Sequence, residues 1–381
     1  MKILFFDHVP VFSGGERSLF DVMLCLKERG WEMGLLLPRW GDLAEEAKKI
    51  GVEVRLISIP DFILRIKREE IGLYPRVLSS LSPIAKELRK AMKGYDILYT
   101  NSQKAHCLSV LVPEFPIIWH FRDILYGRAR ILMNMLSVVP RRIIAISQAV
   151  RRQFWLSAKV RIVYNAVELA GGYGESDKFR VIYDAVEPEV TEKIEIIKGK
   201  KIGMVGQIAP WKGQHNFIEV MAKVLKKRKD VYGVVIGDVV FDKPENRKYK
   251  EMLLKRVKEL GIDDRIIFTG YIKNPYPAMS SLDVLVHVPE EEEPFGRVLV
   301  EAMALKVPVV SHDIGGIKEV VGDAGFVLPY KDFDGMSEKI LEIIENPSLR
   351  EKLVEKGRKR WEENFRLKRL ITQIEGVIKS I

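Results

Sequence analysis

Residues 293–301, which begin and end with a glutamate, are the stretch with the clearest capacity for chemistry. They follow a buried apolar run at 284–287, and their pattern predicts a helix with Pro294 in its first turn. The free N–H groups and the positive dipole end of such a helix form a site for an anion such as a diphosphate. Glu293 and Glu301 are eight residues apart, about two helical turns, so we expect both carboxylates near one face. Carboxylates there could accept hydrogen bonds from sugar hydroxyls.

Two further segments carry residues suited to an anionic ligand. Lys212 lies in a loop after the apolar run Lys201–Val205, where its ammonium would meet a phosphate as a point charge. Gly14 and Gly15 follow the first apolar run, Lys2–Phe6, and paired glycines let a backbone turn tightly against a ligand. The sequence therefore predicts phosphate contacts from loops that follow strands.

The elements that must position these residues are short β-branched runs that alternate with helical patterns. Continuous apolar strands separated by helices are typical of parallel sheets covered on both faces. Two such series predict an α/β protein of two doubly wound domains, with ligands beyond the carboxyl ends of the strands. The predicted strands are 2–6, 33–37, 53–57, 97–100, 117–120, 143–146 and 161–164, then 201–205, 233–236, 266–269, 284–287, 307–311 and 325–328.

Glycines at 171, 172 and 174 indicate the boundary between the domains. We expect a first domain at 1–170, a linker at 171–200 and a second domain at 201–355. Residues 356–381 are helical by pattern and are expected to return to the first domain. Trp361 and Phe365 are the predicted contacts of that helix with the first domain.

Residues 293–304, read as Glu-Pro-Phe-Gly followed by Glu-Ala-Met-Ala, resemble the Glu-x7-Glu motif of retaining glycosyltransferases of family 4. Residues 206–213 resemble the phosphate-contacting loop of that family, and residues 12–17 resemble its glycine loop. The resemblance covers nearly the whole chain. It implies the GT-B architecture, two Rossmann-like domains that face a central cleft, with the acceptor on the first domain and a nucleotide-sugar donor on the second.

Carried onto this chain, the resemblance implies catalytic roles for Glu293, His120 and Lys212. The donor-binding residues it implies are Gly14, Gly15, Gln207, Lys212, Tyr271, Phe295, Gly296, Arg297, Val298 and Glu301. The acceptor residues are Asn101, Arg122 and Asp123. The family usually has Arg where this chain has Gln207, so one cation near the leaving group is missing, and Arg297 is the candidate to compensate.

The implied activity is that of a hexosyltransferase that retains the anomeric configuration. The chain has no Asp-x-Asp motif, so we expect no metal requirement and no cofactor besides the nucleoside-diphosphate sugar, which is a substrate. The expected acceptor is a glycan or a lipid-linked sugar. Two alternatives stay open: a nucleotide-sugar epimerase of GT-B architecture, and a non-catalytic sugar-binding or membrane-binding module, which Gln207 in place of the usual Arg keeps open.

Charge is distributed unevenly along the 381 residues, which carry a net charge of +10. Residues 1–170 hold 26 Lys and Arg against 17 Asp and Glu, whereas the remainder is nearly neutral. Basic surfaces attract anionic partners. Nucleic acid is not expected, because zinc-finger spacing and RNP-like aromatic strands are absent. Two cysteines, a short apolar N-terminus and the lack of an 18-residue apolar run predict a cytoplasmic protein without a signal peptide or membrane span.

Residues 128–142 mix apolar and basic side chains in a helical pattern. The apolar members near one face are Ile131, Leu132, Met135, Leu136 and Val139, and the flanking cations are Arg128, Arg130, Arg141 and Arg142. Such a segment could lie on an anionic membrane surface at the inner face of the cell membrane, or it could be a core-facing helix with solvated ends. The sequence leaves both readings open.

Overall fold

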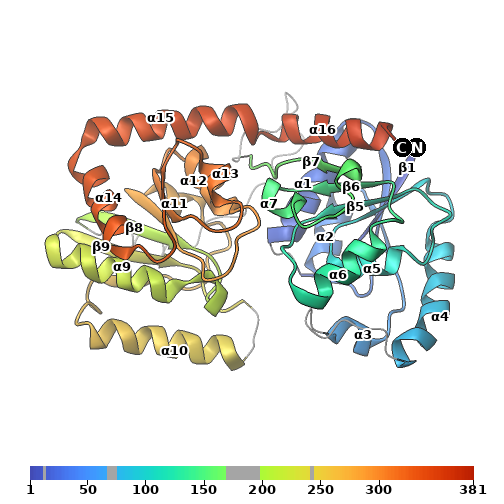
Figure 1. The fold of residues 1–381 in the computed structure, drawn as a ribbon, viewed down its shortest axis with the longest axis horizontal. Coiled ribbons are helices and arrows are strands. Elements are labelled where there is room, and N and C mark those ends of the chain that lie inside the picture. Colours follow the sequence, from blue (N-terminus) through green and yellow to red (C-terminus); the bar gives the residue numbers. More distant parts are fainter. Residues whose placement is uncertain (12–13, 67–74, 169–197, 241–243) are drawn as a thin grey trace. The chain divides into compact units, whose positions relative to one another are not determined.

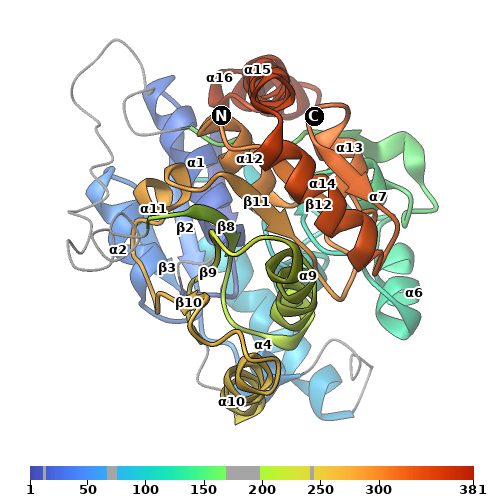
Figure 2. The same ribbon diagram turned by 90° about the vertical axis from the view of Figure 1, so that its left-hand side faces the viewer.

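The structure, a computed structural model, describes residues 1–11, 14–66, 75–168, 198–240 and 244–381. Within these residues the chain forms two compact units, Met1–Ala166 with Leu367–Ile381, and Val167–Arg366. Figure 1 and Figure 2 label the helices and strands of both units. Most of the predicted linker, 171–200, lies outside the described residues, so the predicted domain boundaries stay predictions.

The first unit is built on a sheet of seven parallel strands (Figure 1). Four of its strands are almost wholly apolar and buried, as expected when helices cover both faces of a parallel sheet. In sheet order the strands are β3 (Glu53–Leu56), β2 (Glu32–Leu37), β1 (Lys2–Phe6), β4 (Ile97–Thr100), β5 (Ile117–Phe121), β6 (Arg142–Ala145) and β7 (Val160–Ile162). The helices are α1 (Gly14–Glu28), α2 (Asp42–Lys49), α3 (Asp61–Arg65), α4 (Pro75–Ala91), α5 (Gln103–Ser109), α6 (Gly127–Leu136), α7 (Gln148–Arg151), η2 (Ser157–Lys159) and α16 (Leu367–Lys379).

The second unit is built on six parallel strands. Apolar residues from its strands and from α9, α10, α14 and α15 form one core, in which Phe217 and Ile340 are fully buried. In sheet order the strands are β10 (Ile266–Phe268), β9 (Val231–Ile236), β8 (Lys200–Val205), β11 (Val284–His287), β12 (Val309–His312) and β13 (Phe326–Leu328). The helices are η4 (Pro210–Lys212), α9 (Gln214–Lys227), α10 (Pro244–Glu259), α11 (Tyr276–Ser280), α12 (Arg297–Ala304), α13 (Ile317–Val321), α14 (Phe333–Glu345) and α15 (Pro347–Asn364).

The predicted fold class, two parallel α/β sheets with helices between their strands, is confirmed. All thirteen predicted strands occur in the described residues, with ends that differ by one or two positions. The run predicted to start at Val307 begins as β12 at Val309. Pro308 has no N–H group for the sheet, which explains the later start.

The C-terminal tail is helical, as predicted, and its last helix belongs to the first unit. It forms two helices, of which α15 belongs to the second unit and α16 to the first. The predicted contacts of Trp361 and Phe365 are made with Val167, which lies in the predicted first domain, 1–170, but belongs to the second compact unit; the N–H of Val167 donates to the carbonyl of Phe365 at 2.9 Å. Trp361 Nε1 donates to the carbonyl of Val167 at 2.8 Å, and Phe365 packs edge-on against Phe295 within the second unit.

α16 completes the first unit. Its buried residues Leu370, Ile371 and Ile374 form an apolar face, and the helix packs against α1. Trp31 Nε1 donates to Glu375 at 2.8 Å, which fixes the polar edge of the same contact.

Each sheet reverses its strand order at one place, between β1 and β4 in the first unit and between β8 and β11 in the second. Loops that leave the carboxyl ends of neighbouring strands at such a switch point diverge and leave room for a ligand. Gly14 and Asn101 follow β1 and β4, and Lys212 and Glu293 follow β8 and β11. In the described residues, no helix is long and apolar enough to cross a membrane.

Candidate active site

Lys212 and Glu293 meet at the switch point of the second unit. Lys212 Nζ lies 3.0 Å from Oε2 of Glu293, although the residues are 81 positions apart. Gly213, with φ +76°, makes this approach possible, because a Cβ there would lie 1.9 Å from the carbonyl oxygen of Val288. The turn from η4 into α9 therefore carries Lys212 against the end of β11.

The carboxylate of Glu293 has three polar neighbours. His287 Nε2 lies 3.4 Å from Oε2, the oxygen that Lys212 also contacts, and the N–H of Gly296 donates to Oε1 at 3.3 Å. Burial alone would raise the pKa of Glu293, but the positive charge of Lys212 and the contact with His287 outweigh it and lower that pKa well below its usual range. Glu293 is therefore a carboxylate at neutral pH.

The backbone around Glu293 is fixed from both sides. A Cβ on Gly315 (φ +65°) would lie 2.3 Å from the carbonyl oxygen of Glu293, which in turn accepts a hydrogen bond from Gly316 at 2.8 Å. Glu290 accepts from Lys331 at 2.7 Å, and Lys331 and neighbouring donors lower the pKa of Glu290 to about 2 despite the opposing effect of burial. The loop after β11 thus presents Glu293 in one orientation.

The helix after this loop begins later than the sequence predicts. α12 starts at Arg297, because Gly296 adopts a left-handed conformation (φ +80°) that interrupts a helix, so Pro294 lies outside it. Glu293 and Glu301 consequently do not share a helix face. Glu301 is bound instead by Arg297, whose Nε lies 3.0 Å from Oε1.

The other predicted donor residues of the second unit have varied surroundings. Gln207 is half-buried and its carbonyl accepts from Gln214 at 2.8 Å. Phe295 is buried, so its side chain belongs to the core, whereas Val298 is half-buried and Tyr271 is 57% exposed. Tyr271 follows Gly270, which bridges to Gly237 at the end of β9.

In the first unit, Arg122 connects side chains from the ends of four strands. Its Nε donates to Asn101 at 2.6 Å, and its terminal nitrogens donate to Asn165 and to Nδ1 of His120. Asn101 in turn donates to the buried carboxylate of Asp7 at 2.8 Å. These residues follow or end β1, β4, β5 and β7, so one arginine ties together the carboxyl edge of the sheet.

His120 is buried, and its protonation follows from its partners. An arginine only donates, so Nδ1 accepts from Arg122 at 3.2 Å and contacts the Tyr99 hydroxyl at 2.7 Å. Burial, reinforced by the charge of Arg122, lowers the pKa of His120 well below its usual value. The ring is therefore neutral with its proton on Nε2, and that buried atom has no hydrogen-bond partner among the described residues.

The remaining predicted residues of the first unit lie near this network. Gly14 and Gly15 form the start of α1, and a Cβ at Gly14 would meet no atom within 4 Å. A Cβ at Gly15 would lie 3.8 Å from Arg122, at ordinary contact distance. Asp123 is half-buried, and its carbonyl accepts from Gln153 at 2.8 Å.

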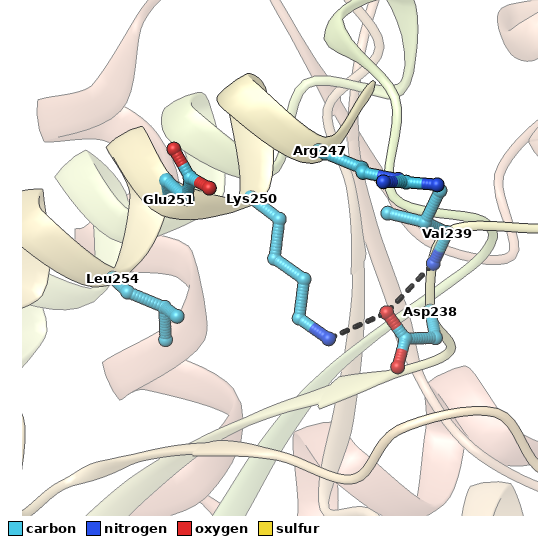
Figure 3. Close-up of a pocket in the computed structure, with 6 residues that line it drawn as sticks. All are labelled: Asp238, Val239, Arg247, Lys250, Glu251 and Leu254. Carbon is cyan, nitrogen blue, oxygen red and sulfur yellow. Dashed lines mark hydrogen bonds and ion pairs between the residues drawn. The ribbon is translucent and has the colours of Figure 1, made fainter. Parts of the chain in front are cut away.

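A separate hollow of about 330 Å³ lies beyond β9, between Asp238 and α10 (Figure 3). Lys250 Nζ donates to Asp238 Oδ1 at 2.6 Å on one wall, and Arg247 and Leu254 also line the hollow. It contains none of the predicted site residues. No group of three or more His, Cys, Asp or Glu side chains that could hold a metal ion occurs in the described part of the chain.

Sequence reasoning missed several residues of these two sites. His287 is the last residue of a predicted strand directly before the acidic run, a position that could have indicated a role. Asp7 likewise directly follows the first strand. Gly315 belongs to a second glycine pair, Gly315-Gly316, which could have indicated a tight backbone approach. Tyr99 has no distinguishing pattern in the sequence.

Residues 12–171 match the family model described as Glycosyltransferase Family 4, and residues 187–360 match the model described as Glycosyl transferases group 1. Together the two matches extend over most of the chain.

Among curated proteins, the chain is 27% identical over 213 residues to an alpha-D-kanosaminyltransferase of Streptomyces kanamyceticus, which is 55% of this chain and 53% of that relative. It is 29% identical over 181 residues to the capsular polysaccharide biosynthesis glycosyltransferase CapM of Staphylococcus aureus, 47% of this chain and 46% of that protein. The chain thus spans about half the length of these relatives.

Among solved structures, HepE of Anabaena in complex with UDP and glucose superposes with a TM-score of 0.81 over 100% of both chains, at 23% identity. At that identity the likeness concerns the fold, and the solved fold agrees with two parallel α/β sheets of seven and six strands.

Proposed function

This chain belongs to glycosyltransferase family 4, as its motifs predict, and on that premise we propose that it transfers a hexosyl group from a nucleoside-diphosphate sugar. The acceptor is a hydroxyl of a glycan or of a lipid-linked sugar, and the anomeric configuration is retained. The observation that carries the proposal is the ion pair of Lys212 with Glu293 at the switch point between β8 and β11. It combines a cation for a diphosphate with a fixed carboxylate for a sugar.

The second unit supplies the charges for this reaction. The bond between the anomeric carbon and the diphosphate oxygen breaks, the bond to the acceptor oxygen forms, and the acceptor proton passes to the leaving diphosphate. Lys212 and the N–H groups near Gly296 and Arg297 offset the negative charge that develops there. Glu293 orients the donor sugar, and Glu301 binds the ribose hydroxyls.

The first unit supplies neutral hydrogen-bond donors. We assign His120 the donation of its Nε2–H to the donor sugar, because the neighbours of Nδ1 leave the proton on Nε2. Arg122 fits the role of a positioning residue for His120 and Asn101 better than that of a direct acceptor ligand, since its contacts are to these side chains. The bare start of α1 at Gly14 and Gly15 admits the diphosphate, and Asp123 stays an acceptor candidate.

We propose UDP as the nucleotide of the donor, without a metal cofactor. Solved structures of HepE contain UDP and UDP-glucose, and they support this choice through a shared fold. The relative that acts in capsular polysaccharide biosynthesis supports a glycan acceptor. We place the reaction in the cytoplasm, at the inner face of the membrane, where an anionic surface is a further partner.

Calorimetric titration with UDP and with GDP, in the presence of EDTA, tests the proposal. We expect UDP to bind, and Glu301→Ala to weaken it at least ten-fold by loss of the ribose contact. Glu338→Ala removes an exposed glutamate on α14 of the same unit and is the matched control. Failure of both nucleotides to bind would contradict the proposal, and conversion of a nucleotide sugar without any acceptor would favour the epimerase.

A further inference from the structure

Six large apolar side chains of the first unit are exposed close together in sequence, on α6, beside its two ends and after α7. Figure 1 labels α6 and α7. We call these six side chains the α6 surface: Tyr126, Ile131, Met135, Val138, Trp155 and Leu156. Met135 and Trp155 are each 62% exposed, whereas Ala129 and Met133 on the other side of α6 are buried. α6 is therefore apolar on both faces, and the interpretation as a purely core-facing helix is wrong for Ile131 and Met135.

Hydrogen bonds hold the two segments of this surface together. Trp155 N–H donates to Oδ1 of the buried Asn134 at 2.7 Å, and Asn134 Nδ2 donates to the carbonyl of Gln153 at 2.9 Å. Lys159 donates to the carbonyl of Val138, which fixes the end of α6 against the segment after α7. Trp155 and Met135 are therefore held on two segments that these hydrogen bonds tie together.

The same part of the chain has an unusual charge. Between Asp123 and Glu168 it holds eight Lys and Arg and no acidic residue. Arg128, Arg141 and Arg152 are exposed and pair with no carboxylate in the described residues. Nearly all of the excess of basic over acidic residues in residues 1–170 therefore comes from this stretch.

We propose that the α6 surface docks onto an anionic phospholipid membrane. Arginines around exposed aliphatic and indole side chains match an interface whose headgroups are negative and whose interior is apolar. Nucleic acid would use the arginines but leave Ile131, Met135 and Val138 in water. Self-association through a two-fold axis would set like charges against each other.

The surface is connected to the candidate acceptor residues. Gln153, next to Phe154 and Trp155, donates from Nε2 to the carbonyl of Asp123 at 2.8 Å and accepts from the N–H of Leu125 at 2.9 Å. Docking would hold the loop that carries Arg122 and Asp123 at the membrane surface, where a lipid-linked acceptor would present its sugar. The docking specifies the membrane partner of the proposed function, and both the docking and this consequence rest on that function.

Flotation with vesicles tests the docking without any readout of activity. The full chain is mixed with phosphatidylcholine vesicles that contain 30% phosphatidylglycerol, or none, at 50 and 500 mM salt. We expect binding to the anionic vesicles that salt weakens. Arg128→Gln with Arg152→Gln reduces partitioning by about five-fold per arginine, and Met135→Ser with Trp155→Ser reduces it by roughly ten-fold.

Two matched pairs serve as controls on the same unit. Trp40→Ser with Leu78→Ser removes apolar side chains of similar exposure away from the α6 surface, and Lys86→Gln with Lys90→Gln removes two exposed cations of α4. Both controls are expected to float like the wild type, and UDP affinity is expected to be unchanged in every variant.

Three results would overturn the proposal. They are no flotation with anionic vesicles at 50 mM salt, equal losses in the α6-surface variants and the control pairs, and conversion of a dimer into a monomer by Trp155→Ser in sedimentation velocity. The last result would assign the α6 surface to contact between copies of this chain.

Discussion

In the first unit the candidate site residues are joined by hydrogen bonds around one arginine, whereas in the second unit they are held as ion pairs. Arg122 connects Asn101, Asn165 and the neutral His120, while Lys212 and Arg297 each face a glutamate. Both groups lie beyond the carboxyl ends of strands at a switch point. Equivalent topological positions thus carry different chemistry. In the first unit one guanidinium donates hydrogen bonds to neutral side chains, whereas in the second unit each cation faces a carboxylate.

The comparison also separates the charge of a unit from the charge of its site. The first 170 residues carry almost the whole basic excess, but eight of their cations lie in the stretch between Asp123 and Glu168 that contains the α6 surface. The second unit is nearly neutral overall, and two of its cations, Lys212 and Arg297, nevertheless lie at the candidate active site. The net charge of a unit therefore indicates which kind of partner its surface attracts, but it does not show where in the unit the active site lies.

Replacement of Glu293 is expected to have the largest effect, on turnover. Glu293→Gln keeps the shape of the side chain but removes the charge that Lys212 faces and that orients the donor sugar. We expect kcat to fall by about a thousand-fold, in the range seen when one preorganised group is lost. Transfer from UDP-glucose to a glycan acceptor is the measurement.

The matched control is Glu291→Gln, an exposed glutamate two residues away in the same loop. It is expected to retain wild-type turnover. If Glu293→Gln were equally active, the ion pairs of the second unit would be structural and the contrast between the units would fail.

Replacement of Arg122 is expected to lower the free energy of unfolding more than replacement of Lys212, its counterpart in the second unit. Arg122→Met leaves the oxygens of the buried Asn101 and Asn165 without their donor, which we expect to cost about 2–4 kcal/mol. Lys212→Met removes the cation that Glu293 faces, but this carboxylate keeps the neighbouring His287 and the N–H of Gly296, so we expect a smaller cost, about 1–2 kcal/mol. Chemical denaturation of both variants measures the difference.

Arg122→Lys sharpens this test, because a lysine lacks the planar fork that reaches three partners at once. It is expected to restore little of the lost stability. Equal losses for Arg122→Met and Lys212→Met would show that the two sites do not differ as the hydrogen bonds and ion pairs indicate.

The strands were predictable because a buried parallel strand is a continuous apolar run, and topology alone indicates the loops after them as candidate ligand sites. The contacts between those loops were not predictable. Asp7, Asn101, Arg122 and Asn165 are far apart in sequence, and no spacing rule connects the ends of different strands. The late start of α12 depends on the conformation of Gly296, which a sequence pattern does not specify.

A histidine of the second unit is expected to make stability depend on pH. Burial lowers the pKa of His312 to about 4, whereas an unfolded histidine titrates near 6.5. Between these values the unfolded chain binds a proton that the folded chain does not, so stability is full above about pH 6.5 and falls as the pH drops towards 4. Thermal unfolding of wild type and His312→Phe at pH 7.5 and 5.0 tests this.

His312→Phe keeps a ring between Tyr330 and Phe333 and removes the titration. The decrease in Tm from pH 7.5 to 5.0 is expected to be smaller by a few degrees in the variant than in the wild type. An identical decrease in both proteins would exclude His312 as a source of the pH dependence.

The smallest expected effect comes from Gln207, where the family usually has an arginine. Arg297, the candidate to compensate, is bonded to Glu301, so part of its charge is already balanced within the second unit. Gln207→Arg would add a cation to the loop after β8, and we expect UDP to bind about five-fold more tightly at low salt, an advantage that 500 mM salt removes. Calorimetry at both salt concentrations measures it, with Gln207→Met as the variant of similar size without charge. If Gln207→Arg left the affinity for UDP unchanged, Lys212 and the start of α12 would already neutralise the diphosphate. The second unit would then need no further cation for its part of the reaction.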